Sequence, residues 1–206
     1  MRSRAPIRSI ALVAALVVGI GGVLPTKPAV AATAPPFEVV FPQETAKTDF
    51  TNSFGDSRSG GRRHKGNDLL APRMTEVYAV AAGTVFFVGI NNLSGRNLKI
   101  DHGAGWESYY LHLNNDNPGT DDGRAPWTLT VAPGVEVGRS VEAGQLIGWV
   151  GDSGNAEGTT PHTHFELRRN GVATNPYRLL VEAYAQAVQS EEAISLLTSL
   201  PVYEVE

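Results

Sequence analysis

The chain has 206 residues, with 17 basic and 21 acidic side chains, five histidines and no cysteine. This length suits one ordinary domain with its own hydrophobic core, and the lack of cysteine excludes disulfides as a source of stability. A net charge of −4 excludes non-specific attraction to nucleic acid and to anionic membranes.

Residues 1–31 have the pattern of a cleaved export signal. Three arginines come before an apolar run at residues 10–24, and the small residues Ala29-Val30-Ala31 follow it. The run is shorter than the ~20 residues that a membrane-spanning helix needs. We therefore expect cleavage after Ala31 or Ala32, no stable membrane anchor, and a secreted or cell-envelope location. Four basic residues leave with the signal, so 13 basic and 21 acidic residues remain, a net charge of −8.

Residues 32–46 are expected to form an extended lead-in, because proline recurs there without a clear hydrophobic period. The peptide from Phe50 to Gly61 has the Gly, Ser, Asp and Asn content of loops. His64 and Asp68 follow, four residues apart. Gly66 lies between them and favours a turn that brings both side chains towards one point. The folded domain is expected at residues 47–177.

Short apolar segments with β-branched and aromatic residues come next, separated by turn residues. The predicted strands are 77–80, 84–90, 97–101, 107–113, 145–150 and 163–168. Short strands with little helix between them predict a mainly β domain with an antiparallel sheet.

A polar loop at residues 114–139 interrupts this series of strands. Its residues Asp116, Asp121 and Asp122 lack the spacing of an EF-hand loop, and ordinary turn chemistry accounts for them better than calcium binding. The loop directly follows His112, so we expect it to form a wall of any groove beside that residue.

The chain is expected to finish as helix. Asn175-Pro176 combines a capping residue with proline at a helix start, and apolar residues then recur at helical spacing. A second short helix is predicted from Ser190 to about Leu200. Residues 178–206 would thus form a helical extension packed on the domain.

Four of the five histidines fall in three short clusters that also contain carboxylates. In a strand, His162, His164 and Glu166 share one face, while the residues between them face the core. Together with His64, Asp68 and His112, these groups offer the imidazole and carboxylate ligands that zinc accepts. Glu166 is expected either to orient a histidine or to lie in solvent. His102, at the end of a strand, is interpreted as structural.

The order of these clusters resembles that of the lysostaphin-like (LytM-type) zinc metallopeptidases, which cut peptide bonds in bacterial cell-wall peptidoglycan. The shared features are His-x-x-x-Asp at His64 and Asp68, a histidine after a tyrosine-containing strand at His112, and His-x-His with Phe-Glu from His162. Flanking similarity runs from about Phe54 to Pro176 and includes Val141-Glu142-Ala143-Gly144-Gln145.

The resemblance implies a role for each of these residues. His64, Asp68 and His164 would be ligands of a catalytic Zn²⁺, while His112 and His162 would move protons, with base and donor unassigned between them. The implied fold is an antiparallel β-sheet core of the lysostaphin-like, duplicated hybrid motif type, with C-terminal helices. The implied partner is a peptidoglycan peptide, bound by a monomer. Some relatives use an upstream aromatic residue in the transition state, but here arginines (Arg58, Arg62, Arg63) stand nearby, so that role stays unassigned.

Two other functions are weighed against an active zinc endopeptidase. A catalytically inactive relative would bind cell wall or regulate a wall hydrolase, but such proteins typically lack ligands that are all present here. Residues 141–150 also look like the hybrid motif of sugar-transport phosphoryl carriers, although the export signal argues against a cytoplasmic carrier. The bond that is cut stays open between a D-Ala–diamino acid cross-link, a glycine bridge and a bond within the stem peptide.

Overall fold

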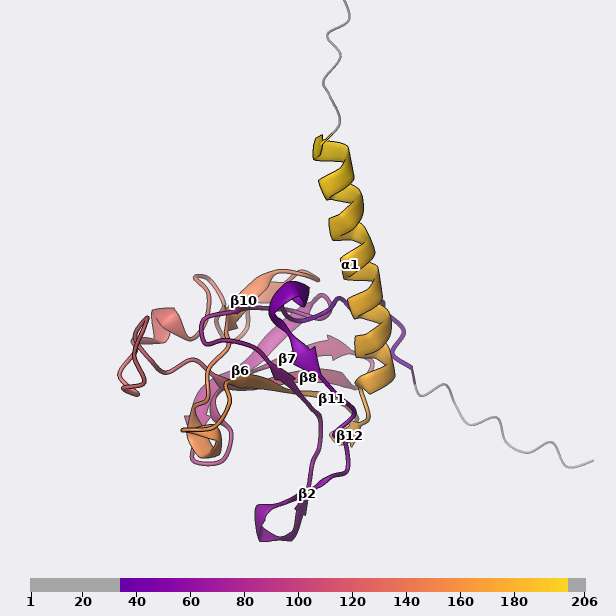
Figure 1. Ribbon diagram of the computed structural model, residues 1–206. Coiled ribbons are helices and arrows are strands. Elements are labelled where there is room, and N and C mark those ends of the chain that lie inside the picture. Colours follow the sequence, from indigo (N-terminus) through magenta and orange to yellow (C-terminus); the bar gives the residue numbers. More distant parts are fainter. Residues whose placement is uncertain (1–33, 200–206) are drawn as a thin grey trace, which may run out of the picture. The chain divides into compact units, whose positions relative to one another are not determined.

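The computed structural model describes residues 34–199, so the predicted export signal lies outside the described residues (Figure 1). The strands are β1 (Asp49–Phe50), β2 (Ser57–Arg58), β3 (Arg62–Arg63), β4 (Asn67–Leu70), β5 (Glu76–Tyr78), β6 (Gly83–Asn91), β7 (Gly95–Gly103), β8 (Trp106–Leu113), β9 (Ser140–Val141), β10 (Leu146–Trp149), β11 (His162–Arg169) and β12 (Val172–Thr174). The helices are α1 (Tyr177–Ser199) and the 3-10 turns η1 (Thr45–Lys47), η2 (Ser59–Gly61), η3 (Trp127–Leu129) and η4 (Gly154–Ala156). Within residues 34–199, no helix combines the length and the apolar character needed to cross a membrane.

The main sheet is antiparallel, with the strand order β1-β4-β11-β8-β7-β6-β9 and β12 paired to β11. The mainly β fold predicted from the sequence is therefore confirmed, and the six predicted strands correspond to β5, β6, β7, β8, β10 and β11. The strands that the sequence did not indicate have two to four residues each. Such short segments contain too few alternating positions to carry a period.

Strand β4 corrects the expectation for the segment between His64 and Asp68. Asp68 lies within this strand and not in a turn, and it pairs directly with His164 of β11. Gly66 has a negative φ, so it does not supply the special backbone conformation of a turn that was expected of it. A β-carbon there would lie 2.0 Å from the carbonyl oxygen of Phe165, so glycine is what allows the chain to approach β11 closely.

Strand β11 lies between β4 and β8, and its side chains alternate as the sequence predicts. Thr163, Phe165 and Leu167 are almost fully buried in the core. His162, His164 and Glu166 point to the opposite face, where they line a cleft. One central strand therefore supplies both core residues and cleft residues.

Residues before Lys47 belong to the folded unit, which corrects the start expected near that residue. Val39 and Phe41 are buried in the core, and the Val40 N–H donates to the Val80 carbonyl at 2.8 Å. The segment is extended, as its prolines indicated. Its apolar side chains nevertheless pack against the domain.

The C-terminal region is one helix, α1, where the sequence predicted two. Ser190 does not cap a second helix, because its hydroxyl donates to the Gln186 carbonyl one turn earlier, at 2.9 Å. The buried face of α1 includes Leu180 and Ala183, and Tyr184 packs edge-on against Phe41 with ring centroids 5.1 Å apart. At the start of the helix, the Asn175 side chain accepts a hydrogen bond from the Tyr177 N–H, as predicted for a capping residue.

Candidate metal centre

A cleft of about 800 Å³ opens on the face of the sheet formed by β4, β11 and β8, beside the hairpin of β2 and β3. All five candidate site residues line it: His64, Asp68, His112, His162 and His164. They come from segments far apart in the sequence. Antiparallel pairing of β11 with both β4 and β8 brings them together.

Three of these residues converge on one point. The distance from His64 Nε2 to His164 Nδ1 is 2.7 Å, and Asp68 Oδ1 lies 3.0 Å from the former and 2.9 Å from the latter. Their ligand atoms form one group of the kind that can hold a metal ion. Two neutral imidazoles and one carboxylate suit a hydrolytic zinc site, in which three protein ligands leave a further position open.

The second nitrogen of each imidazole has its own partner. His64 Nδ1 lies 2.8 Å from the Ser53 carbonyl oxygen, and His164 Nε2 lies 3.1 Å from Glu166 Oε1. In the tautomer that binds a metal, these acceptors take the N–H of the outer nitrogen, which leaves lone pairs on His64 Nε2 and His164 Nδ1 directed at one point. Metal-binding histidines have this arrangement, because the outer acceptor fixes both the tautomer and the ring orientation.

The electrostatics of the three residues also favour a cation. Burial raises the pKa of Asp68, but hydrogen bonds from His164 and His64 outweigh it and hold that pKa well below its usual range. Burial lowers the pKa of His164, while hydrogen bonds to Asp68 and Glu166 outweigh it, so that this pKa is raised. Asp68 is therefore ionised, and the site draws positive charge whether it comes as a proton or as a metal ion.

His112 and His162 lie beside this group with their rings 5.1 Å apart. His112 Nδ1 lies 2.8 Å from the Ser153 carbonyl, and His162 Nδ1 lies 2.8 Å from the Thr160 carbonyl. Nε2 of each ring therefore remains available to take up or release a proton. Burial lowers the pKa of His112 to about 4, so that its imidazole is neutral at physiological pH.

The backbone of His112 explains how its side chain reaches the cleft. Regular alternation along β8 would place Tyr109 and Leu111 on the cleft face and His112 in the core. His112 has a φ of 61°, in the left-handed region, which is uncommon for a residue other than glycine. This local twist lets Tyr109, Leu111 and His112 all line the cleft.

A second layer of charged side chains supports the ligands. Arg58 Nη2 lies 2.6 Å from Asp68 Oδ2, the oxygen that does not face the histidines. Glu166 is buried and bonds both His164 and Arg168, so it orients a histidine and is not a solvated strand carboxylate. The sequence placed Arg58 near the site without a role. The structure places it against Asp68.

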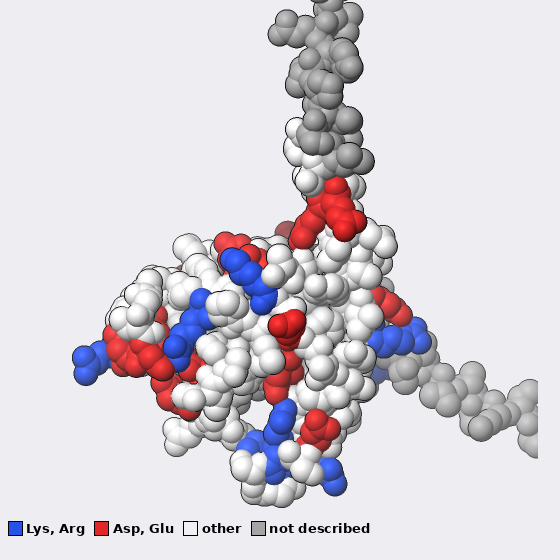
Figure 2. Space-filling view, in the orientation of Figure 1, with Lys and Arg blue, Asp and Glu red and all other residues white. Residues whose placement is uncertain are grey.

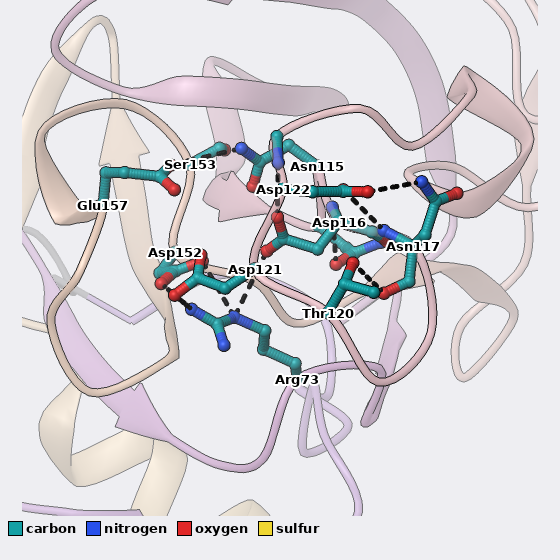
Figure 3. A network of polar contacts seen from close by, with 12 residues as sticks. Arg73, Asn115, Asp116, Asn117, Thr120, Asp121, Asp122, Asp152, Ser153 and Glu157 are labelled. Carbon is teal, nitrogen blue, oxygen red and sulfur yellow. Dashed lines mark hydrogen bonds and ion pairs between the residues drawn. The ribbon is translucent and has the colours of Figure 1, made fainter.

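The loop at residues 114–139 does not form a wall of the cleft, which corrects the expectation from its position after His112. None of its residues lines that cleft. Figure 3 shows the loop held instead by Arg73, which pairs with Asp116 at 3.2 Å, Asp121 at 2.7 Å and Asp152 at 2.5 Å. Asp152 precedes Ser153, whose carbonyl contacts His112. The loop is therefore linked to the site indirectly, through Arg73, Asp152 and the Ser153 carbonyl that contacts His112.

Other sequence candidates have structural contacts. His102 bonds the Ala82 carbonyl and the Ser108 hydroxyl, both at 2.8 Å, in agreement with its structural interpretation. Tyr110 is buried, and its hydroxyl accepts the Val80 N–H. Arg62 and Arg63 are exposed at the rim of the cleft.

The residues that the sequence did not indicate act mainly through backbone carbonyls, such as that of Ser53, which bonds His64. A backbone carbonyl is present in every residue, so no side-chain pattern could have revealed these contacts.

Many solved and curated proteins are similar to this chain, and three of them illustrate the match. The "DD-carboxypeptidase/endopeptidase Mpg" of Neisseria meningitidis is 32% identical over 147 residues, which are 68% of this chain and 30% of that protein. A zinc-containing peptidase from Vibrio cholerae has a TM-score of 0.53 and 26% identity, covering 67% of this chain and 39% of that one. The catalytic domain of lysostaphin from Staphylococcus simulans has a TM-score of 0.50 and 28% identity, covering 65% of this chain and 92% of that domain.

This chain thus matches less than a third of the length of the Neisseria relative, but nearly all of an isolated lysostaphin catalytic domain. The model of peptidase family M23 matches residues 62–123 and 128–176, more than half of the chain. The matched residues begin just before His64 and extend beyond His164 and β12. With the fold and the resemblance in agreement, the chain belongs to peptidase family M23.

Proposed function

We propose that this protein is an exported zinc metalloendopeptidase that hydrolyses peptide bonds in bacterial cell-wall peptidoglycan. The observation that carries the proposal is the convergence of His64 Nε2, Asp68 Oδ1 and His164 Nδ1, with two further histidines beside them. Membership of a peptidase family and the endopeptidase names of its relatives support it. Action on cell wall implies a location outside the cytoplasmic membrane, in agreement with the predicted export signal.

In this proposal His64, Asp68 and His164 hold the metal. Zinc bound there supplies a Lewis acid that polarises the scissile carbonyl and acidifies water. Arg58 keeps Asp68 in place through its second oxygen, and Glu166 keeps the His164 ring in place. A ligand set with one carboxylate keeps a net positive charge on the occupied site, which suits an electrophilic role.

His112 and His162 hold and move protons at Nε2. Their Nδ1 atoms are engaged with the Ser153 and Thr160 carbonyls, so Nε2 of each ring is the atom that can take up or give a proton in the cleft. Since burial keeps His112 neutral, this residue is suited to accept a proton from the attacking water. His162 carrying a proton on Nε2 then donates it to the leaving amine or hydrogen-bonds the developing oxyanion, and His112 passes on the water proton when the products leave.

A cell-wall digestion assay tests the proposal. Purified protein is incubated with isolated peptidoglycan in zinc-containing buffer, in buffer with a chelator, and after zinc is restored. New free amino groups should appear with zinc, stop with the chelator and return on restoration. Tight binding to peptidoglycan without any new amino groups would instead favour the catalytically inactive, wall-binding alternative.

A further inference from the structure

The cleft is basic although the chain as a whole is acidic. Six basic side chains line it, against the two carboxylates of Asp68 and Glu166; the six are Arg58, Arg62, Arg63, Lys65, Lys99 and Arg168. Figure 2 shows Lys and Arg gathered around the hairpin of β2 and β3, and Asp and Glu gathered around the loop that follows β8. A cleft lined by charge of one sign focuses its field and concentrates ligands of the opposite sign.

Lys99 differs from the other cations of the cleft in its partners. Its Nζ lies 4.5 Å from the ring centroid of Tyr109 and 4.6 Å from that of Phe87. Arg58 and Arg168, in contrast, are paired with the two carboxylates of the cleft. Among residues 34–199, no oxygen accepts a hydrogen bond from Lys99 Nζ, and no carboxylate forms an ion pair with it. A half-buried ammonium group thus has three donors that no described oxygen satisfies.

The position of Lys99 relative to the candidate metal centre follows from strand register. Lys99 and Glu166 both pair with Tyr109, so the three form one row across β7, β8 and β11. The next row on the same face contains His164 and Leu111, beside Asp68. Rows two residues apart are separated by about 6.8 Å and neighbouring strands by about 4.8 Å, so the backbone of Lys99 lies roughly 12 Å from that of His164. The long Lys99 side chain reaches back across Tyr109 towards the centre of the cleft.

We propose that Lys99 binds a carboxylate of the substrate and makes the enzyme selective for anionic peptides over neutral ones such as glycine bridges. This inference rests on the proposed function. The carboxylate would belong to a residue a few positions from the cleaved bond, on the side of the cleft formed by β7 and β8. Arg168, whose guanidinium carbon lies 4.5 Å from the Tyr109 ring, adds positive charge at the same place.

Lys99 is therefore a specificity-determining residue, and a matched pair of substrates tests it. One substrate is a cross-linked stem-peptide dimer with its free carboxylates, and the other is the same dimer with those carboxylates converted to carboxamides. The wild-type kcat/KM should favour the carboxylate form by roughly tenfold, the size of one charge-assisted hydrogen bond. This preference should shrink at high salt, because ions screen the interaction.

Substitution separates Lys99 from the general charge of the cleft. Lys99→Met should reduce the preference to near unity, while Lys99→Arg should keep most of it. Lys47→Met is the matched control, because Lys47 is exposed, is paired with Glu44 and does not line the cleft. Melting temperatures of all variants show whether each is folded.

Two results would overturn the assignment: equal kcat/KM for the two substrates with the wild-type protein, or full preference retained in folded Lys99→Met. Binding to zinc-free protein, followed by NMR shifts of the Tyr109 ring, separates this inference from the proposed function. Selective binding of the carboxylate form without cleavage of either dimer would support Lys99 while contradicting the endopeptidase. Cleavage of both dimers at equal rates would support the endopeptidase while contradicting the role of Lys99.

Discussion

At the residue scale, the site depends on which nitrogen of each histidine carries the proton. Four imidazoles meet in one cleft, and each has one nitrogen engaged by an acceptor: the Ser53, Ser153 and Thr160 carbonyls and the Glu166 carboxylate. In the tautomer that binds a metal, the remaining nitrogens of His64 and His164 carry lone pairs that face inward. Such an arrangement favours a shared cation over a network of direct hydrogen bonds between the rings.

The pKa of His112 gives a test at this scale. Because burial lowers that pKa to about 4, NMR titration of the metal-free protein should show the imidazole protonating near pH 4. An exposed histidine would titrate near 6.5. The sign follows from linkage: between these values the unfolded chain binds more protons, so the contribution of His112 to stability falls as pH falls through this window. A midpoint near 6.5 in the folded protein would show that burial does not control this residue.

Arg58 provides a test of support for the metal ligands. Arg58→Met removes the partner of Asp68 Oδ2, and we expect zinc affinity to fall by about 10–100-fold, as is usual for residues that orient a ligand. Competition with a chromophoric chelator measures this affinity. Arg62→Met is the control, since Arg62 also lines the cleft but its side chain bonds only Ser59 within the described residues 34–199. Equal affinities in the two variants would remove the role given to Arg58.

At the element scale, the approach of β4 to β11 is what places Asp68 against His164. Gly66→Ala puts a β-carbon 2.0 Å from the Phe165 carbonyl oxygen, so the two segments must separate. We expect a loss of about 3 kcal/mol in the free energy of unfolding, measured by urea denaturation. Gly61→Ala meets no atom within 4 Å but has a φ of 72°, so backbone strain should cost it about 1 kcal/mol. If the two variants lost equal stability, close approach at Gly66 would not be the cause.

The Arg73 cluster gives a second test at the element scale. Arg73→Met leaves the buried carboxylates of Asp116 and Asp152 without their cation, and we expect a loss of about 3 kcal/mol in unfolding free energy. Arg124→Met is the matched control, because Arg124 lies exposed in the same loop and forms no ion pair within residues 34–199. Chemical denaturation compares the two. Equal stability of both variants would show that Arg73 does not hold the loop.

Elements with strong periodicity could be predicted from the sequence, and those fixed by contacts between segments could not. The sequence predicted which residues of β11 face the core and which face the cleft, because polar and apolar side chains alternate along this eight-residue strand. Strand β4 has four residues, and its assignment depends on pairing with β11, which no local pattern encodes. Likewise, the left-handed backbone of His112 depends on its neighbours in the sheet, so its route into the cleft could not be predicted.

At the scale of the whole molecule, charge is divided between two regions of an acidic protein. Basic residues gather around the cleft, while the loop after β8 contributes Asp116, Asp121 and Asp122, which face Arg73 or backbone amides. The ordered histidine and carboxylate motifs identified the five candidate site residues without the structure. They did not indicate Lys99, because the role proposed for it depends on the lack of a described carboxylate partner, which only the structure reveals.

The metal content of five purified variants, with the turnover of each on peptidoglycan, tests the central claim most directly. The wild-type protein should hold one zinc ion per chain. Substitution of His64, Asp68 or His164 by alanine should remove both zinc and activity, while His112→Ala and His162→Ala should keep zinc and lose turnover. Full activity in a folded variant of any of the three ligands, or zinc retained at full occupancy in all of them, would contradict this account.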